Sequence, residues 1–144
     1  MYKYTVLVLI LSSIWACNNP KSSTNMATAT VQDSSTLKIS LAEWSFHKAL
    51  FDKKMDHLGF IAKAGAMGFS GVEYVNQFFA DKASDTSYLN KMTAACKIAG
   101  VAQLLIMVDN EGYLADMDKT KRDSAVTNHY KWVDAAAYLG CHSI

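Results

Sequence analysis

The chain has 144 residues, of which 51% are hydrophobic and only one is proline, so its composition is that of a globular protein rather than a disordered one. The 14 Lys and Arg residues against 13 Asp and Glu leave a formal net charge of +1, which gives no basic footprint for nucleic acid. The charges are also scattered along the sequence, so no polybasic segment for anionic lipid is present.

The N-terminal residues have the pattern of an export signal. One lysine precedes an apolar run from Tyr4 to Ile14, which is too short to cross a bilayer as a helix. The run leads into Ile14-Trp15-Ala16-Cys17, which resembles the lipobox of bacterial lipoproteins, where the cysteine is acylated and the peptide is cut just before it. We therefore expect residues 1–17 to be a signal peptide and Cys17 to be lipidated. An ordinary signal peptide or a buried strand is the alternative.

Residues 18–36 are rich in Ser, Thr, Asn and Ala and contain almost no large apolar side chains. This composition is typical of a flexible tether. Together, the two segments predict an exported protein that a lipid anchor holds on the periplasmic side of a bacterial membrane.

From Leu37 onward, extended apolar stretches alternate with amphipathic helices that end in glycine. The patterns predict strands over residues 37–46, 71–75 and 101–108, and a fourth strand that starts near residue 141. Helices are expected over about 52–67, from 84–87 to 99, and over about 121–139, with Gly68, Gly100 and Gly140 as their stops. The helix positions expected to face the core are Leu58, Ile61, Ala62 and Gly65; Leu89, Met92, Cys96 and Ala99; and Ala125, His129, Trp132, Val133 and Ala136.

Strands that alternate with helices in this way predict an α/β fold with right-handed crossovers and a parallel sheet. Two architectures remain, a small open parallel α/β sheet and part of a closed (β/α)8 TIM barrel. No glycine-rich phosphate turn follows the first strand, which disfavours a nucleotide-binding open sheet. Because a whole barrel takes about 250 residues, the chain would supply about three and a half βα units, its N-terminal portion.

Three segments of residues 37–144 match one family in order and spacing: Ser40–Phe46 (SLAEWSF), Ala64–Tyr74 (AGAMGFSGVEY) and Leu139-Gly140-Cys141. They resemble the opening of xylose-isomerase-like TIM barrels, a family of sugar phosphate isomerases and epimerases. The family signature is a strand that ends Trp-Ser-Phe, a helix that ends Gly-Phe-x-Gly and a strand that begins Val-Glu. The resemblance covers the whole predicted mature domain.

This resemblance implies a metal-dependent sugar isomerase or epimerase that moves a proton next to a carbonyl. Family members hold a divalent cation (Mn, Mg, Co or Zn) with two Glu, an Asp and a His from the second half of the barrel. We therefore expect those ligands to lie beyond residue 144, and no catalytic or metal-binding residue within this chain, which would be inactive alone. A non-catalytic carbohydrate-binding lipoprotein on the same scaffold is the alternative; a related phosphodiesterase or endonuclease fits the charge balance less well. The oligomeric state stays open.

The candidate substrate-binding residues follow the C-terminal ends of the predicted strands, where barrel sites gather. Trp44 and His47 suit stacking on a sugar and hydrogen bonding to its hydroxyl groups, although they could also pack the barrel rim. Glu73 is a carboxylate in an apolar strand, which is costly unless it is functional or bonded to a neighbouring strand. Asn76 comes directly after the second strand and could bind hydroxyls, although loop polarity alone explains it. Asp109, after the third strand, is also a substrate-binding candidate; with Glu111 it could form a metal site or an acid/base pair, although a plain turn with Gly112 is favoured.

The remaining polar candidates have structural interpretations. Glu111 lies in an acidic segment that ends in glycine and reads as a turn. His129 is expected to be a core histidine, and His57 is expected on a helix surface. Cys96 and Cys141 read as small buried hydrophobes, with a disulfide between them as the alternative in an exported protein.

Overall fold

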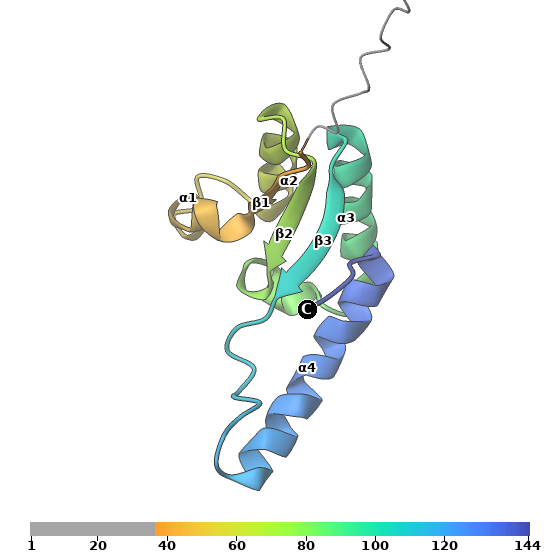
Figure 1. Cartoon of the computed structure of the whole chain (residues 1–144). Helices are drawn as coiled ribbons and strands as arrows, with labels where there is room; N and C mark the ends of the chain where they lie inside the picture. The colour runs from red at the N-terminus through yellow and green to blue at the C-terminus, as the bar shows by residue number, and fades with distance from the viewer. Residues whose placement is uncertain (1–36) are drawn as a thin grey trace, which may run out of the picture. The chain divides into compact units, whose positions relative to one another are not determined.

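Three parallel strands form the centre of the molecule (Figure 1). The structure is a computed structural model that describes residues 37–144; the predicted signal peptide, Cys17 and the tether lie outside the described residues. Strand β1 spans Ser40–Ala42, β2 spans Gly71–Val75 and β3 spans Ala102–Met107. Their order in the sheet is β1-β2-β3, with every pair parallel. The prediction of an α/β fold with a small parallel sheet is therefore confirmed.

Helical segments connect the strands. Their bounds are η1 Glu43–Phe46, α1 His47–Phe51, α2 His57–Ala66, η2 Asn76–Lys82, α3 Thr86–Ala99 and α4 Lys119–Leu139. None of the helices in residues 37–144 has the length and apolarity that a membrane span requires. After α4, a fourth extended segment comes to lie beside β3: the His142 N–H donates to the Leu104 carbonyl at 2.9 Å, and Ser143 forms a parallel bridge with Leu105.

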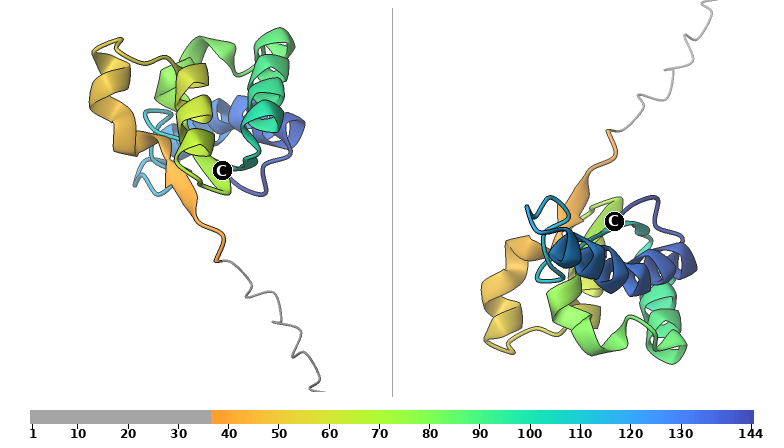
Figure 2. Two further views of the ribbon diagram at one scale, coloured as in Figure 1. Left: turned by 90° about the horizontal axis from the view of Figure 1, so that it is seen from above. Right: turned by 90° about the horizontal axis from the view of Figure 1, so that it is seen from below.

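The long helices lie together on one face of the sheet. Helix α2 packs against α3, and α3 packs against α4, as the two views of Figure 2 also show. The strand residues that point to the helices are buried, among them Val72, Tyr74 and Ile106. On the opposite face, which we call the open face, Ser40, Ala42, Glu73, Leu105 and Met107 remain half-buried or exposed, whereas Gly71 and Val75 are buried.

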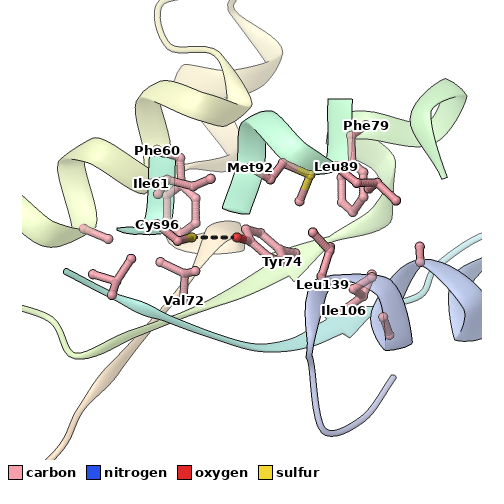
Figure 3. Packing of buried hydrophobic residues seen from close by; sticks show 14 of the residues in the cluster. Phe60, Ile61, Val72, Tyr74, Phe79, Leu89, Met92, Cys96, Ile106 and Leu139 are labelled. Atoms are coloured by element: carbon pink, nitrogen blue, oxygen red, sulfur yellow. Dashed lines mark hydrogen bonds between the residues drawn. The ribbon is translucent and has the colours of Figure 1, made fainter. Parts of the chain in front are cut away.

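The core lies between the sheet and these helices (Figure 3). Its largest fully buried side chains come from every layer and include Phe60 of α2, Tyr74 of β2 and Trp132 of α4. Phe79 meets the Trp132 ring edge-on at 5.2 Å between centroids. The Tyr74 hydroxyl donates to Gln103 Oε1 at 2.9 Å and lies 3.1 Å from the Cys96 sulfur. The polar tip of Tyr74 is thus hydrogen-bonded, which avoids the cost of burying a bare hydroxyl.

A glycine sets the distance between α2 and α3. A Cβ atom at Gly65 would lie 2.4 Å from the Ala99 carbonyl oxygen, a separation that two such atoms cannot adopt. Gly65 therefore lets the two helix backbones approach closely. The sequence prediction placed Gly65 on the core-facing stripe; the structure shows that it faces the neighbouring helix instead.

Two predictions for the first βα unit are wrong. The strand expected over residues 37–46 ends at Ala42, because Glu43 turns inward and its carboxylate accepts the backbone N–H of Val75 at 2.8 Å. The helix expected from residue 52 begins at His57, where the Asp56 side chain caps it by accepting the Gly59 N–H. Its buried positions are His57, Phe60, Ile61 and Ala64 rather than Leu58, Ala62 and Gly65.

The later units follow the prediction more closely. Strand β2 has the expected bounds, and the α3 stripe of Leu89, Met92 and Cys96 is buried. Gly100 and Gly140 end α3 and α4 in the left-handed conformation, with φ of 69° and 74°, which glycine adopts without strain.

On α4 the stripe is only partly as expected. Val133 is 47% exposed, and Ala135 and Leu139 face the core in its place. His129 is half-buried and bonds the Ala125 carbonyl of its own helix through Nδ1 at 2.7 Å. Cys96 and Cys141 are both free thiols.

Candidate functional site

The segments that follow the three strands gather at one end of the sheet, because the strands are parallel. These are η1 and α1 after β1, η2 after β2, and residues 108–118 after β3. In parallel α/β folds, ligands bind at this end.

Four rings from η1, α1 and η2 form what we call the aromatic shelf: Trp44, His47, Phe51 and Phe78. The Trp44 and His47 rings stack with 4.9 Å between centroids and 13° between planes. Phe51 contacts Trp44 edge-on at 6.1 Å and Phe78 at 5.1 Å. Trp44 is 42% exposed, so part of its ring surface is open to solvent. Sequence analysis singled out Trp44 and His47; the structure shows that they are in contact and adds the two phenylalanines.

The hydrogen bonding of His47 fixes how its ring is presented. Its Nδ1 lies 2.8 Å from the Trp44 carbonyl oxygen, so Nδ1 carries a proton and donates it to that oxygen. In the neutral ring Nε2 is then a hydrogen-bond acceptor. The shelf thus combines an exposed indole with an acceptor atom beside it.

A buried carboxylate–imidazole pair, Glu43 and His57, lies next to the shelf in the sequence and was missed as a site by sequence analysis. Glu43 is 0% exposed and His57 is 3% exposed; His57 Nδ1 and Glu43 Oε1 are 2.5 Å apart. The expectation that His57 lies on a helix surface is therefore wrong. Positions 57, 60, 61 and 64 repeat at the spacing of one helix face, and this spacing was the signal that could have placed His57 inside.

Glu73 lies on the open face rather than at the end of the sheet. It accepts a hydrogen bond from the Ser40 hydroxyl of the neighbouring strand at 2.5 Å. Its register partners are Ala42 and Leu105. Of the two interpretations that the sequence allowed, a structural bond between strands is the one visible here.

Asn76 and Asp109 come together after β2 and β3. The buried Asn76 amide donates to the Asp109 carbonyl oxygen at 2.9 Å and accepts the Asp109 N–H at 3.0 Å. Gln77 Nε2 donates to the Asp109 carboxylate at 3.0 Å. Asn76 thus joins the two strand ends and has both ends of its amide engaged.

The acidic turn after β3 is held by α4. Glu111 Oε1 accepts hydrogen bonds from Trp132 Nε1 and from Lys131 Nζ, each at 2.7 Å. Partial burial raises the pKa of Glu111, but the bonds from Lys131 and Trp132 outweigh it and leave the pKa below its usual range. Glu111 therefore has a structural role, which agrees with its interpretation as part of a turn.

No metal centre is formed by this part of the chain. Within residues 37–144, no three His, Cys, Asp or Glu side chains gather closely enough to hold a metal ion. The described residues therefore do not fit the divalent cation that the family resemblance implies.

No protein-family model matches the chain, and a search of curated proteins finds no similar sequence. The geometry of the candidate residues places Trp44 with His47 and Asn76 with Asp109 at the carboxyl end of the sheet, and Glu73 on the open face.

Proposed function

We propose that residues 37–144 form the first units of a (β/α)8 barrel of the xylose-isomerase-like type. The sequential strand order and the position of the helices on one face support this. A doubly wound open sheet reverses its strand order and carries helices on both faces. The open face, with Glu73 and Met107 half-buried or exposed, would become the inside of the barrel.

We further propose that the aromatic shelf binds a sugar, as the substrate wall of an isomerase or epimerase. The observation that carries this is the exposed Trp44 ring stacked on His47 at the carboxyl end of the sheet. The C–H face of a sugar ring packs well on an indole, and a neighbouring imidazole nitrogen can accept a bond from a hydroxyl group. These residues bind and orient the substrate.

The implied divalent metal would be held by residues outside 37–144, because the described residues provide no ligand group. We therefore assign no proton-transfer step to this part of the protein. Binding by the shelf and turnover by the full-length enzyme are separate claims, and they need separate tests.

Quenching of tryptophan fluorescence tests binding by the shelf. Trp44 is partly exposed, whereas Trp132 is fully buried, so acrylamide should quench Trp44 more than Trp132. We expect xylose or fructose at millimolar concentration to protect Trp44 from acrylamide in the whole chain. A Trp44→Phe variant supplies the background from the other tryptophans and should show no protection. Equal quenching with and without every sugar tried would refute the shelf as a sugar site.

The alternative function is a lipoprotein that binds carbohydrate without converting it. The same shelf supports it, because stacking on Trp44 requires no metal. The two functions differ in D₂O with manganese: an isomerase or epimerase exchanges a carbon-bound hydrogen next to the carbonyl for deuterium, whereas a binding protein does not. This measurement requires the full-length protein.

We also propose that Cys17 carries the lipid anchor. In a Gram-negative host, labelled fatty acid should enter the wild-type chain, and the protein should fractionate with membranes. The Cys17→Ala variant should incorporate no label and should leave the membrane fraction or remain as an uncut precursor. A wild-type chain that never incorporates the label would contradict the anchor.

A further inference from the structure

A cleft of about 370 Å³ opens beside the shelf, between the start of α2, η2 and the start of α3. Its polar wall is formed by Lys53, Asp56, His57 and Tyr88, and Phe78 contributes an aromatic face. Phe78 is the one residue that the cleft and the aromatic shelf have in common. The volume lies within the range of small-molecule pockets, about 300–1,000 Å³.

The hydrogen bonding of His57 leaves one ring nitrogen available. The Glu43 carboxylate accepts from the Val75 N–H through one oxygen and lies 2.5 Å from His57 Nδ1 through the other. With Glu43 as a carboxylate and His57 as a neutral ring, Nδ1 carries the shared proton. Nε2 is then a lone-pair acceptor, and it has no hydrogen-bond partner among the described residues.

The His57 ring cannot easily turn away to find another partner. Phe79 stacks on it with 4.6 Å between centroids, and Tyr74 and Tyr88 lie 5.2 and 6.1 Å away. A buried acceptor without a partner destabilises a fold. A side chain that is held this firmly in a costly state points to a ligand that completes its bonding.

The charges of the cleft select the kind of ligand. Lys53 and Asp56 both line it, so Asp56 would repel an anion and Lys53 would repel a cation. The N-termini of α2 and α3 are already occupied by their own caps, Asp56 and Asp85. Burial raises the pKa of Tyr88, with smaller contributions from Asp56 and Glu43, which keeps its phenol neutral. A neutral molecule with several hydroxyl groups matches these donors and acceptors without repulsion.

The end of α1 forms one side of the cleft. Lys53 has a φ of 55° because it is the left-handed residue that stops α1: its N–H donates to the Leu50 carbonyl at 3.1 Å, and the Lys54 N–H donates to the Ala49 carbonyl at 2.9 Å. This helix stop places Lys53 in the cleft wall, between α1 and α2.

We propose that this cleft binds a neutral polyhydroxylated small molecule and that Nε2 of His57 accepts a hydrogen bond from one of its hydroxyl groups. Since His57 is only 3% exposed, the ligand reaches it when a long side chain of the wall, such as Lys53 or Met55, moves aside. The site goes beyond the sugar-binding shelf, because it uses a different set of side chains and requires no barrel closure.

Nitrogen NMR of the histidine rings in the whole chain is the test. The His57 signals are identified by elimination with His47→Gln, His129→Gln and His142→Gln, which avoids any change to the buried pair. In the free protein, His57 should show a protonated Nδ1 and a bare Nε2. Myo-inositol, xylose and fructose are added as neutral probes, and acetate, phosphate and Zn²⁺ as charged ones.

We expect at least one neutral probe to shift the His57 Nε2 signal saturably at millimolar concentration. The same titration on Trp44→Phe should give an unchanged shift, which separates the cleft from the shelf. A matched pair, Tyr88→Phe against Tyr113→Phe, should weaken the affinity several-fold only for Tyr88, since Tyr113 is exposed away from the cleft. No shift with any neutral probe, or a shift with acetate, phosphate or Zn²⁺ alone, would overturn the proposal.

Discussion

The two faces of the sheet are built from the same strands but have different surroundings. On the face toward the helices, Ile106 is 0% exposed and packs in a continuous core. Its neighbour Met107, on the open face, is 42% exposed. Parallel sheets are normally covered on both sides, so the two faces of these three strands are not equally complete within residues 37–144.

The two faces contribute differently: the helix face stabilises this part of the protein, whereas the open face leaves surface that is accessible for contacts. The helix face contributes the burial of Tyr74, Phe60 and Trp132, which dominates the stability. The open face contributes a side-chain hydrogen bond between strands, from Ser40 to Glu73, and apolar surface that is still accessible. Four substitutions or conditions can break or sharpen this comparison.

The largest effect is expected from a matched pair on β3. Ile106→Ala removes a fully buried side chain and should lower the free energy of unfolding by about 2–5 kcal/mol. Met107→Ala removes a half-exposed one and should cost less than about 1 kcal/mol. Urea denaturation followed by circular dichroism measures both. Equal losses would mean that the open face is as well packed as the helix face.

The helix face should also make the protein sensitive to alkali. Burial raises the pKa of Tyr74 and Cys96, and together with the charge of Cys96 it raises the pKa of Cys141 from 9.0 to about 11. The unfolded chain therefore loses these protons first, so the contribution of these three groups to stability should be constant below pH 9 and fall as the pH rises through 9 to 11. Tyr74→Phe should reduce the fall above pH 10, whereas Tyr113→Phe at an exposed position should not. A melting temperature that is unchanged from pH 8 to pH 11 would contradict this.

A smaller effect is expected from the polar bond of the open face. Ser40→Ala leaves the half-buried Glu73 carboxylate without its donor and should cost about 1 kcal/mol. Ser45→Ala, at an exposed position in η1, should stay within about 0.5 kcal/mol of the wild type. If both variants match the wild type, water replaces the Ser40 hydroxyl without loss, and the open face is more solvated than the structure indicates.

The smallest change in stability, with a clear change in association, is expected from Met107→Lys. A charge on the open face should alter the free energy of unfolding by less than about 0.5 kcal/mol. Residues 37–144 should self-associate through this apolar face and through the free edges of the strands, and the lysine should reduce that association. Sedimentation velocity at several concentrations distinguishes the two chains. A wild-type fragment that is monomeric at every concentration would show that the open face does not mediate self-association.

The sequence allowed the regular parts of the fold to be predicted. Gly71–Val75 and the α3 stripe through Met92 were correct, because apolar periodicity and a terminal glycine decide such elements locally. The first βα unit was not correct. Its strand ends early because the Glu43 carboxylate bonds to Val75, which is distant in the sequence, and no local pattern encodes that contact.

In the candidate site, too, local sequence features could be predicted, whereas contacts between distant segments could not. Trp44 and His47 could be singled out from their position after a strand, whereas Phe51 and Phe78 join them only through the fold. The Glu43–His57 pair was missed because the buried stripe of the helix was assigned to Leu58, Ile61, Ala62 and Gly65, each one position later than the residues that are buried, His57, Phe60, Ile61 and Ala64. The bond from Asn76 to the Asp109 backbone could not be anticipated, since it depends on how the ends of two strands meet.

The strand order also bears on how the chain acquires its structure during synthesis. Each strand pairs with the strand of the preceding unit: β2 with β1, β3 with β2, and the segment at Ser143 with β3. No strand has to wait for a partner that is made much later. Each new unit can therefore dock on the edge left by the previous one as it leaves the ribosome. Parallel pairing is slow when its partners are far apart in sequence, and this arrangement keeps every partner one unit away.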